Sequence, residues 1–147
     1  MSSLDIAATL CIGLLLGTEF AVSAFINPII YRLEERAQAA AIRLFAVRLG
    51  KVMPFWYAAS LIFLILEAIL HRHQTGLSLL ITAATIWTAV ILLTLLFLVP
   101  INNRMMRLST TEFPETQRRE HKKWDTRHRL RVAALSTAFV CFLLAIH

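Results

Sequence analysis

An apolar stretch of 25 residues, Leu77–Ile101, carries no charged side chain and most constrains what this chain can fold into. About 20 apolar residues in helical conformation are enough to cross the hydrocarbon core of a bilayer. Three further apolar stretches occur at Ile6–Ile30, Val52–Leu70 and Val132–Ile146. The last has only 15 residues, so we expect its helix to extend toward the N-terminus, with Arg and Lys side chains reaching the headgroups. The sequence therefore predicts four transmembrane spans.

The composition supports this interpretation and excludes several other classes of protein. Apolar residues make up 58% of the chain and charged residues 16%, against about 25% charged residues in an average soluble domain. A soluble domain of 147 residues has too much surface for its volume to hide so many apolar side chains. Inside a bilayer the backbone must hydrogen-bond internally, and four segments are too few to close a barrel. We therefore predict an all-α integral membrane four-helix bundle, with residues 1–147 as a single domain.

The basic residues give the chain a net charge of +6, and their distribution predicts its orientation. Fourteen of the fifteen Lys and Arg residues lie in two connections, residues 31–51 and 102–131. Because cytoplasmic loops are enriched in Lys and Arg, we expect both connections in the cytoplasm and both termini outside. The basic residues are not accompanied by a zinc-finger spacing, an RNA-binding motif or a phosphate-binding loop. The expected partner is therefore the lipid bilayer and not a nucleic acid.

The three connections between spans differ in character. His71–Gly76 is short and predicts a tight turn between antiparallel spans. Glu34–Leu49 is amphipathic and rich in Ala, which predicts a helix that continues the second span into the cytoplasm. In the third connection, Thr110 or Thr111 can cap a helix that leads into the fourth span, with Pro114 tolerated near its first turn.

The direction of each span places polar residues from three spans at the same membrane depth. Two spans end, and the fourth begins, at the cytoplasmic side. The residues found there are Asn27 on the first span, Asn102 and Asn103 on the third, and Trp124, His128 and Arg131 on the fourth. Positions 124, 128 and 131 follow the i, i+4, i+7 spacing of a single helix face. We expect these side chains to meet in a chamber that opens toward the cytoplasmic leaflet.

Glu19 lies deeper in the first span and is the strongest candidate for a chemical role. Glu19, Ser23 and Asn27 share one helix face, and Glu19 is about 12 Å deeper than Asn27 at about 1.5 Å per residue. A carboxylate at mid-membrane costs roughly 2.5–3.5 kcal/mol on insertion scales. Such a group serves as a proton-transfer residue, or it is protonated and bonds another helix, or it pairs with Arg131.

The other polar residues of the chamber also have two interpretations each. His128 can exchange a proton near neutral pH or bind a metal, but it can also lie at headgroup level. Arg131 can hold an anionic oxygen or anchor its span at the membrane surface. Trp124 fits an interfacial belt residue better than a residue that stacks on a substrate. The three asparagines can bind a substrate or simply end their helices.

A second group of ionisable residues lies at the opposite end of the second span. The residue types of Glu67, His71 and His73 are those of metal ligands, and Glu67 and His71 are four residues apart on one helix face. His73 is off that face, and two exposed ligands do not close a metal site. We therefore expect an exposed interfacial cluster at this position.

Two smaller features concern contacts within the bundle or between chains. Cys11 and Cys141 lie at comparable depths on the first and fourth spans, where we favour two unpaired buried thiols over a disulfide. Gly13 and Gly17 have the GxxxG spacing, which allows close approach of another helix, either within the bundle or in a homo-oligomer.

Three motifs together resemble those of one family of small membrane proteins. The first is Asn27-Pro28, the second is Pro100-Ile101-Asn102-Asn103, and the third is Trp124-x-x-x-His128-x-x-Arg131. In these motifs, and in its length and number of spans, the chain resembles the anthrone oxygenase-like family, long catalogued as a domain of unknown function. The resemblance implies a four-helix membrane fold and, for some members, oxidation of a polyketide anthrone to an anthraquinone.

The resemblance also implies a set of roles at the chamber. The sequence has no flavin, nicotinamide or haem motif, so O₂ chemistry requires either a substrate that is itself easily oxidised or a bound metal ion. In the first version Glu19 or His128 removes a proton from the substrate, while Arg131 and the Asn amides hold the resulting anion. In the competing version His128 and Glu19 bind a metal, which is a sparse ligand set.

These observations lead to one expected function and two alternatives. We expect a membrane-embedded oxidoreductase of oxygenase type, acting on a small lipophilic metabolite, aromatic or phenolic, that enters from the cytoplasmic leaflet. The first alternative is a non-catalytic accessory protein or a lipid- or small-molecule-binding protein. The second is the protomer of a small transporter, for which four helices are few unless the chain dimerises.

Overall fold

The computed structural model describes residues 2–109 and 113–147, and this part of the chain is helical with no β-strand. Four helical segments are long and apolar enough to cross a membrane, which confirms the predicted all-α membrane bundle. The first segment consists of α1 (Ser3–Ala21), the π-helical turn η1 (Val22–Ile26) and α2 (Asn27–Ile30). The second is α3 (Glu35–Leu70) and the fourth is α6 (Glu115–Ile146). The third consists of α4 (Leu77–Leu93), the π-helical turn η2 (Thr94–Leu98) and α5 (Val99–Met105).

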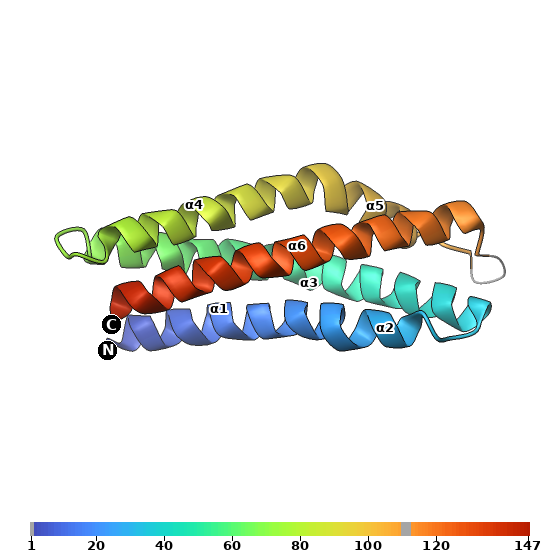
Figure 1. The fold of residues 1–147 in the computed structure, drawn as a ribbon, viewed down its shortest axis with the longest axis horizontal. Helices are drawn as coiled ribbons and strands as arrows, with labels where there is room; N and C mark the ends of the chain where they lie inside the picture. The colour runs from blue at the N-terminus through green and yellow to red at the C-terminus, as the bar shows by residue number, and fades with distance from the viewer. Residues whose placement is uncertain (1, 110–112) are drawn as a thin grey trace.

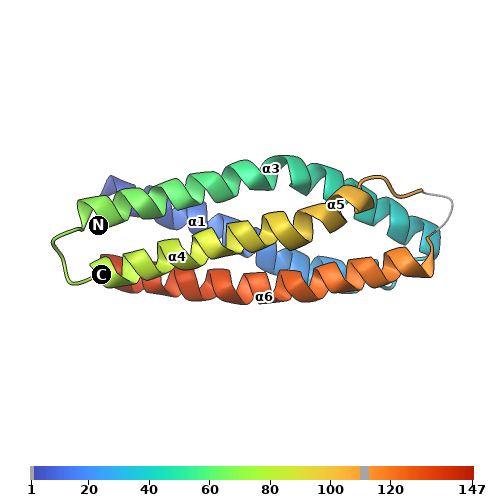
Figure 2. The same ribbon diagram turned by 90° about the horizontal axis from the view of Figure 1, so that it is seen from above.

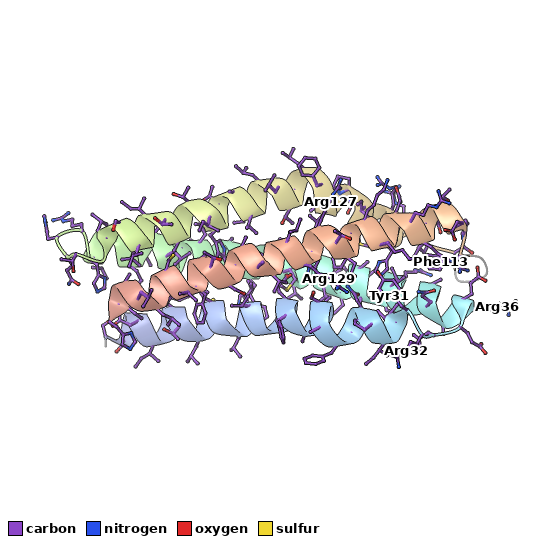
Figure 3. The ribbon with its side chains drawn as sticks, in the orientation of Figure 1. Tyr31, Arg32, Arg36, Phe113, Arg127 and Arg129 are labelled. Atoms are coloured by element: carbon purple, nitrogen blue, oxygen red, sulfur yellow. The ribbon has the colours of Figure 1, made fainter. Side chains whose placement is uncertain are left out.

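The segments run alternately up and down the long axis of the molecule (Figure 1). Both termini and the turn at residues 71–76 lie at one end, which we call the terminal end. The α2–α3 and α5–α6 connections lie at the other end, which we call the loop end (Figures 1 and 2). Helix α1 contacts α3 and α6, and α4 also contacts α3 and α6, so each segment packs between two antiparallel neighbours. Which end faces the cytoplasm stays a prediction. Figure 3 shows four labelled arginines in the loop-end half of the molecule, namely Arg32, Arg36, Arg127 and Arg129.

A π-helical turn lies just before the proline in two of the spans, the first and the third. Pro28 and Pro100 have no backbone N–H, and a proline ring inside an α-helix also crowds the preceding turn. The wider turn before each proline lets the N–H of Asn27 bond the carbonyl of Val22, and that of Val99 bond the carbonyl of Thr94. Figure 1 shows the resulting change of direction between α4 and α5. Such turns often occur at functional sites, and both of these border the cavity described below.

The apolar core is divided into two clusters along the bundle. The cluster nearer the terminal end is built from fully buried side chains such as Leu15, Trp87 and Phe142. The indole N–H of Trp87 donates to the carbonyl of Tyr57 at 3.2 Å, so the polar atom of this large side chain is satisfied. The cluster nearer the loop end includes Ile42 and Met105. The polar site lies between the two clusters and draws on all four segments.

Several expectations for the connections can be compared with the structure. The amphipathic stretch before the second span is helical and continuous with it, since α3 begins at Glu35. The fourth span extends N-terminally as expected, since α6 begins at Glu115. Its N-cap is Pro114, without a side-chain cap, while the proposed caps Thr110 and Thr111 lie outside the described residues.

The cysteines and the GxxxG glycines can also be located. Cys11 and Cys141 are both free, as favoured from the sequence, although each is only partly buried. A Cβ atom on Gly13 would lie 3.5 Å from the ring of Phe139, whereas nothing lies within 4 Å of one on Gly17. Within the described residues, Gly13 therefore serves packing inside the bundle and Gly17 does not.

Candidate functional site

A cavity of about 410 Å³ lies between the two core clusters and is lined by residues from all four helical segments. Its walls are mostly apolar, with residues such as Met53, Leu95 and Leu98. Six of the sequence-predicted site residues line it: Glu19, Asn102, Asn103, Trp124, His128 and Arg131. The volume falls within the range of about 300–1,000 Å³ that is usual for small-molecule sites. An apolar chamber with a few convergent polar groups suits a lipophilic ligand.

Glu19, His128 and Arg131 form a compact buried cluster on one wall of this cavity. Glu19 is 2% exposed and His128 is 1% exposed. The guanidinium of Arg131 donates from Nη2 to Oε2 of Glu19 at 2.6 Å, and the same Nη2 lies 2.8 Å from Nδ1 of His128. Nδ1 of His128 is 3.1 Å from Oε2 of Glu19. Three residues that are distant in sequence or separated by a helical turn thus share one set of polar contacts.

The contacts of His128 determine which of its nitrogens carries the proton. Nε2 lies 3.1 Å from the backbone carbonyl of Glu19, and a carbonyl oxygen can only accept a hydrogen bond. Nε2 is therefore the donor, and in the neutral imidazole Nδ1 is left as an acceptor for the N–H of Arg131. In this tautomer both Nδ1 of His128 and Oε2 of Glu19 are acceptors, and no proton lies between them. One proton can be added there, on either the imidazole or the carboxylate, which is the property required of a general base.

Arg131 is held in position by two further residues that the sequence analysis did not identify. Its Nη1 donates to the hydroxyl of Thr94 at 3.4 Å, and Thr94 opens the π-helical turn η2. Its guanidinium carbon lies 5.5 Å from the centre of the Tyr57 ring. Two buried polar atoms beside Glu19 lack a hydrogen-bond partner, namely the Tyr57 hydroxyl and Nε of Arg131. Because buried polar atoms are usually paired, these atoms indicate a place for a ligand or water oxygen.

Trp124 stacks on imidazoles of its own helix. The Trp124 ring is nearly parallel to the His128 ring at 4.7 Å between centroids, and to the His121 ring at 6.0 Å. His121 precedes Trp124 by three residues and His128 follows it by four, so the two imidazoles lie on opposite sides of the indole along the helix. Trp124 therefore fixes the plane of the His128 ring and presents its edge to the cavity.

Asn27 is the one sequence-predicted site residue that does not line the main cavity. Its side-chain amide donates to Oδ1 of Asp125 at 2.6 Å. It borders a separate hollow of about 50 Å³ together with His121 and Trp124. Burial, followed by the nearby Asp125 carboxylate, raises the pKa of the neighbouring Tyr31 hydroxyl above its usual value. Asn27 therefore belongs to a buried polar group that joins the first span to α6 beside the site.

Asn102 and Asn103 lie where α5 passes close to α3. The Asn102 amide donates to the carbonyl of Ala46 at 3.4 Å. A Cβ atom on Gly50 would lie 2.8 Å from the nitrogen of that amide, so glycine at position 50 leaves room for it. Gly50 was not identified from the sequence, since a single glycine inside a long helical pattern gives no indication of what approaches it.

Two observations bear on metal binding and on larger hollows. Nη2 of Arg131 lies within 2.8 Å of both Oε2 of Glu19 and Nδ1 of His128, the two atoms that would bind a metal ion. A guanidinium therefore occupies the position between them that a metal ion would need. A larger hollow of about 690 Å³ lies between α3 and α4, and among the described residues that line it Arg72 alone is charged. The main cavity therefore offers acid–base chemistry by its own side chains, and the larger hollow offers none.

The expectation for Glu67 and its neighbours was wrong. Glu67 is 0% exposed, because Asp5 at the start of α1 and the packing of the bundle cover it. The residue that joins Glu67 and His71 in space is Asp5, not His73. The sequence could not show this, since Asp5 and Glu67 come together only through the antiparallel packing of α1 on α3.

Comparison with known protein families identifies a match for this chain. The model of a family described as anthrone oxygenase matches residues 41–141, which is more than half of the chain. The matched region contains the α3 and α5 walls of the cavity and the residues Trp124, His128 and Arg131. No curated protein and no solved structure gives a significant match.

Proposed function

The chain belongs to the anthrone oxygenase family, and from this premise we propose that it is a membrane-embedded oxidoreductase that acts on a small lipophilic phenolic or anthrone-like metabolite. The observation that carries the proposal is a carboxylate and an imidazole held by one guanidinium on the wall of an apolar cavity. The match supports an oxygenase-type role in general. The substrate class and the roles of individual residues are part of the proposal.

The proposed substrate is a carbon acid whose anion is electron-rich enough to react with O₂. In an anthrone the methylene group between two aromatic rings lies opposite a ketone, so loss of a methylene proton places negative charge on the ketone oxygen. Arg131, with its unpartnered Nε–H, and the unpartnered Tyr57 hydroxyl can donate to that oxygen. The amides of Asn102 and Asn103 lie on the same cavity and can bind the phenolic hydroxyls.

The base in this scheme is the Glu19–His128 pair. The pair has room for one proton between Oε2 and Nδ1, which lie 3.1 Å apart. Arg131 donates to both acceptors, and the donation from Nε2 to the Glu19 carbonyl fixes the imidazole tautomer. When the substrate proton arrives, the charge that it adds is offset by the anion formed beside Arg131. Burial strengthens each of these electrostatic interactions, because the local dielectric is low.

The overall reaction balances with O₂ as the only oxidant. The substrate carbanion forms a C–O bond with O₂ and takes up a proton, giving a hydroperoxide on that carbon. Breaking the O–O bond, with loss of the remaining C–H proton, leaves a ketone and releases water. One CH₂ group and one O₂ become one C=O group and one H₂O. No step is assigned to a metal ion or to an organic cofactor.

The test is the rate of O₂ uptake and of quinone formation by the purified protein in lipid nanodiscs with an anthrone. We expect Glu19→Gln and His128→Gln to lower kcat by about 10²–10⁴-fold, the usual contribution of general acid–base catalysis. Matched controls are Glu115→Gln, whose side chain is 64% exposed, and His73→Ala, which lies in the terminal-end turn. Both controls should leave kcat unchanged.

The outcome also separates the proposal from a non-catalytic role. If the wild-type protein binds anthrones but converts them no faster than empty nanodiscs, the protein is a binding or accessory module. If it turns over and the two site variants remain folded with unchanged kcat, the base lies elsewhere. Either result would overturn the assignment of Glu19 and His128.

A further inference from the structure

A second cluster of ionisable side chains lies at the terminal end, on the opposite side of the apolar core from the cavity. Glu67 is in the last turn of α3 and His71 is the C-cap of the same helix. Asp5 lies in the first turn of α1. One ligand atom from each of these three side chains lies within 4.8 Å of the other two. The proposed function makes no use of this cluster.

The carboxylate of Glu67 lacks the partners that a buried charge requires. Glu67 is 0% exposed and neither of its side-chain oxygens has a hydrogen bond. On α3, Nδ1 of His71 lies 3.2 Å from Oε2 of Glu67. A buried carboxylate without a partner is strongly unfavourable, and a second carboxylate, that of Asp5, lies next to this one. The arrangement therefore requires a cation or a proton.

Asp5 is divided between a structural contact and a free oxygen. Its Oδ2 accepts from the backbone N–H of Ser2, while the Asp5 N–H donates to the Ser2 hydroxyl, which completes a capping box at the start of α1. Its Oδ1 is buried and has no partner. Asp5 can thus cap its helix with one oxygen and offer the other to a ligand.

His71 completes a donor set with one nitrogen and two carboxylates. Glu67 and His71 are one helical turn apart, so both face the same side of α3. In the structure Nδ1 of His71 lies 3.0 Å from the carbonyl of Glu67. Binding through Nδ1 would release that contact, and the ring proton would then reside on Nε2. Imidazole together with carboxylates suits Zn²⁺ and similar transition-metal ions, whereas Mg²⁺ and Ca²⁺ prefer oxygen ligands alone.

We propose that Asp5, Glu67 and His71 bind a divalent transition-metal ion such as Zn²⁺ at the terminal end of the bundle. The ion compensates the two buried carboxylates and links the beginning of α1 to the end of α3. Three protein ligands leave at least one coordination position for water. The site is separate from the Glu19–His128–Arg131 cluster, so its failure would not affect the proposed oxidoreductase function.

The experiment measures Zn²⁺ binding to the whole protein in nanodiscs after chelation and reloading, with Co²⁺ absorption as an optical probe of the ligands. We expect one ion per chain and a Tm that rises by about 5 °C at a concentration of about 100 times Kd. Glu67→Gln and His71→Ala should weaken binding by at least about 10- to 100-fold, the loss seen when only a supporting group is removed. Mg²⁺ should give no shift in Tm.

Two controls make the result specific. His73→Ala removes a neighbouring histidine outside the cluster, and His128→Gln removes the imidazole of the other cluster; neither should change Zn²⁺ affinity. Without metal, Glu67→Gln should be at least as stable as the wild type, because it removes one of two like charges. The proposal is overturned if the wild type binds no Zn²⁺, which would indicate a proton shared by Asp5 and Glu67. Equal loss in His73→Ala, or loss only in His128→Gln, would overturn it as well.

Discussion

Removing the charge of Glu19 tests how the ion pair at the cavity is held. Glu19→Gln keeps the shape of the side chain but leaves Arg131, whose side chain is 11% exposed, without its carboxylate. Two unit charges about 4 Å apart attract by about 4 kcal/mol at an effective dielectric constant of about 20. Breaking a buried pair by removing one partner typically costs about 3–5 kcal/mol. We therefore expect Glu19→Gln to lower the free energy of unfolding by about 3 kcal/mol or more.

The pairwise part of this loss follows from a double-mutant cycle. Arg131→Met removes the cation and leaves Glu19 buried and unpaired, so it should be destabilising to a similar degree. The double variant E19Q/R131M leaves neither charge uncompensated, and its loss should be smaller than the sum of the single losses by about 2–3 kcal/mol. Unfolding in mixed micelles, followed by tryptophan fluorescence, measures all four free energies.

A surface ion pair on the same protein provides the control. Arg104 and Glu120 approach to 2.8 Å, but their side chains are 53% and 32% exposed. The corresponding cycle with E120Q and R104M should give a coupling of no more than about 1 kcal/mol. If the Glu19–Arg131 coupling is no larger than that of this exposed pair, the cavity wall is hydrated. The reasoning from burial would then be refuted.

Three further predictions concern glycines and their neighbours. Gly50→Ala places a Cβ atom 2.8 Å from the Asn102 amide nitrogen. The Asn102 side chain can move away, and alanine favours the helix by about 1 kcal/mol over glycine, so Tm should change little. Because the displaced amide lines the cavity, KM for the substrate should rise. Gly76→Ala places a Cβ atom against the backbone carbonyl oxygen of Ala145, closer than van der Waals contact allows. Because this backbone cannot move easily, the free energy of unfolding should fall by about 1–3 kcal/mol. Gly17→Ala meets nothing within 4 Å and should leave the stability of a monomer unchanged; a lower sedimentation mass for this variant would indicate that Gly17 packs against a second chain.

The features that could be predicted from the sequence are those that depend on the bilayer and on helix periodicity. Long apolar stretches such as Leu77–Ile101 have few structures open to them, because an unpaired backbone group in hydrocarbon is so unfavourable. The direction of each span then fixes which polar residues share a depth, and the i, i+4, i+7 spacing fixes which share a face. This is why Glu19, His128 and Arg131 could be expected together before any contact was known.

The features that could not be predicted depend on contacts between distant segments. Asp125 is 98 residues away from Asn27 in the chain, and its charge sits within a run of basic residues that looks like an exposed surface. Glu67 stands at the end of an apolar stretch, which usually means an interfacial position, yet the N-terminus of α1 covers it. The π-helical turn at Thr94–Leu98 leaves no mark in hydropathy, although Pro100 indicates that some adjustment is needed.

The two buried carboxylates of this bundle follow one physical rule with different results. Glu19 is 2% exposed and has a guanidinium 2.6 Å away, so the chain itself provides the cation that a carboxylate in a membrane requires. Glu67 is 0% exposed, and the described residues place beside it another carboxylate and a histidine 3.2 Å away, with no guanidinium. Because the requirement is the same at both positions, the compensating charge at Glu67 must come from a bound metal ion or from an added proton, on a carboxyl group or on His71. The contrast explains why acid–base chemistry is assigned to the first cluster and metal binding to the second.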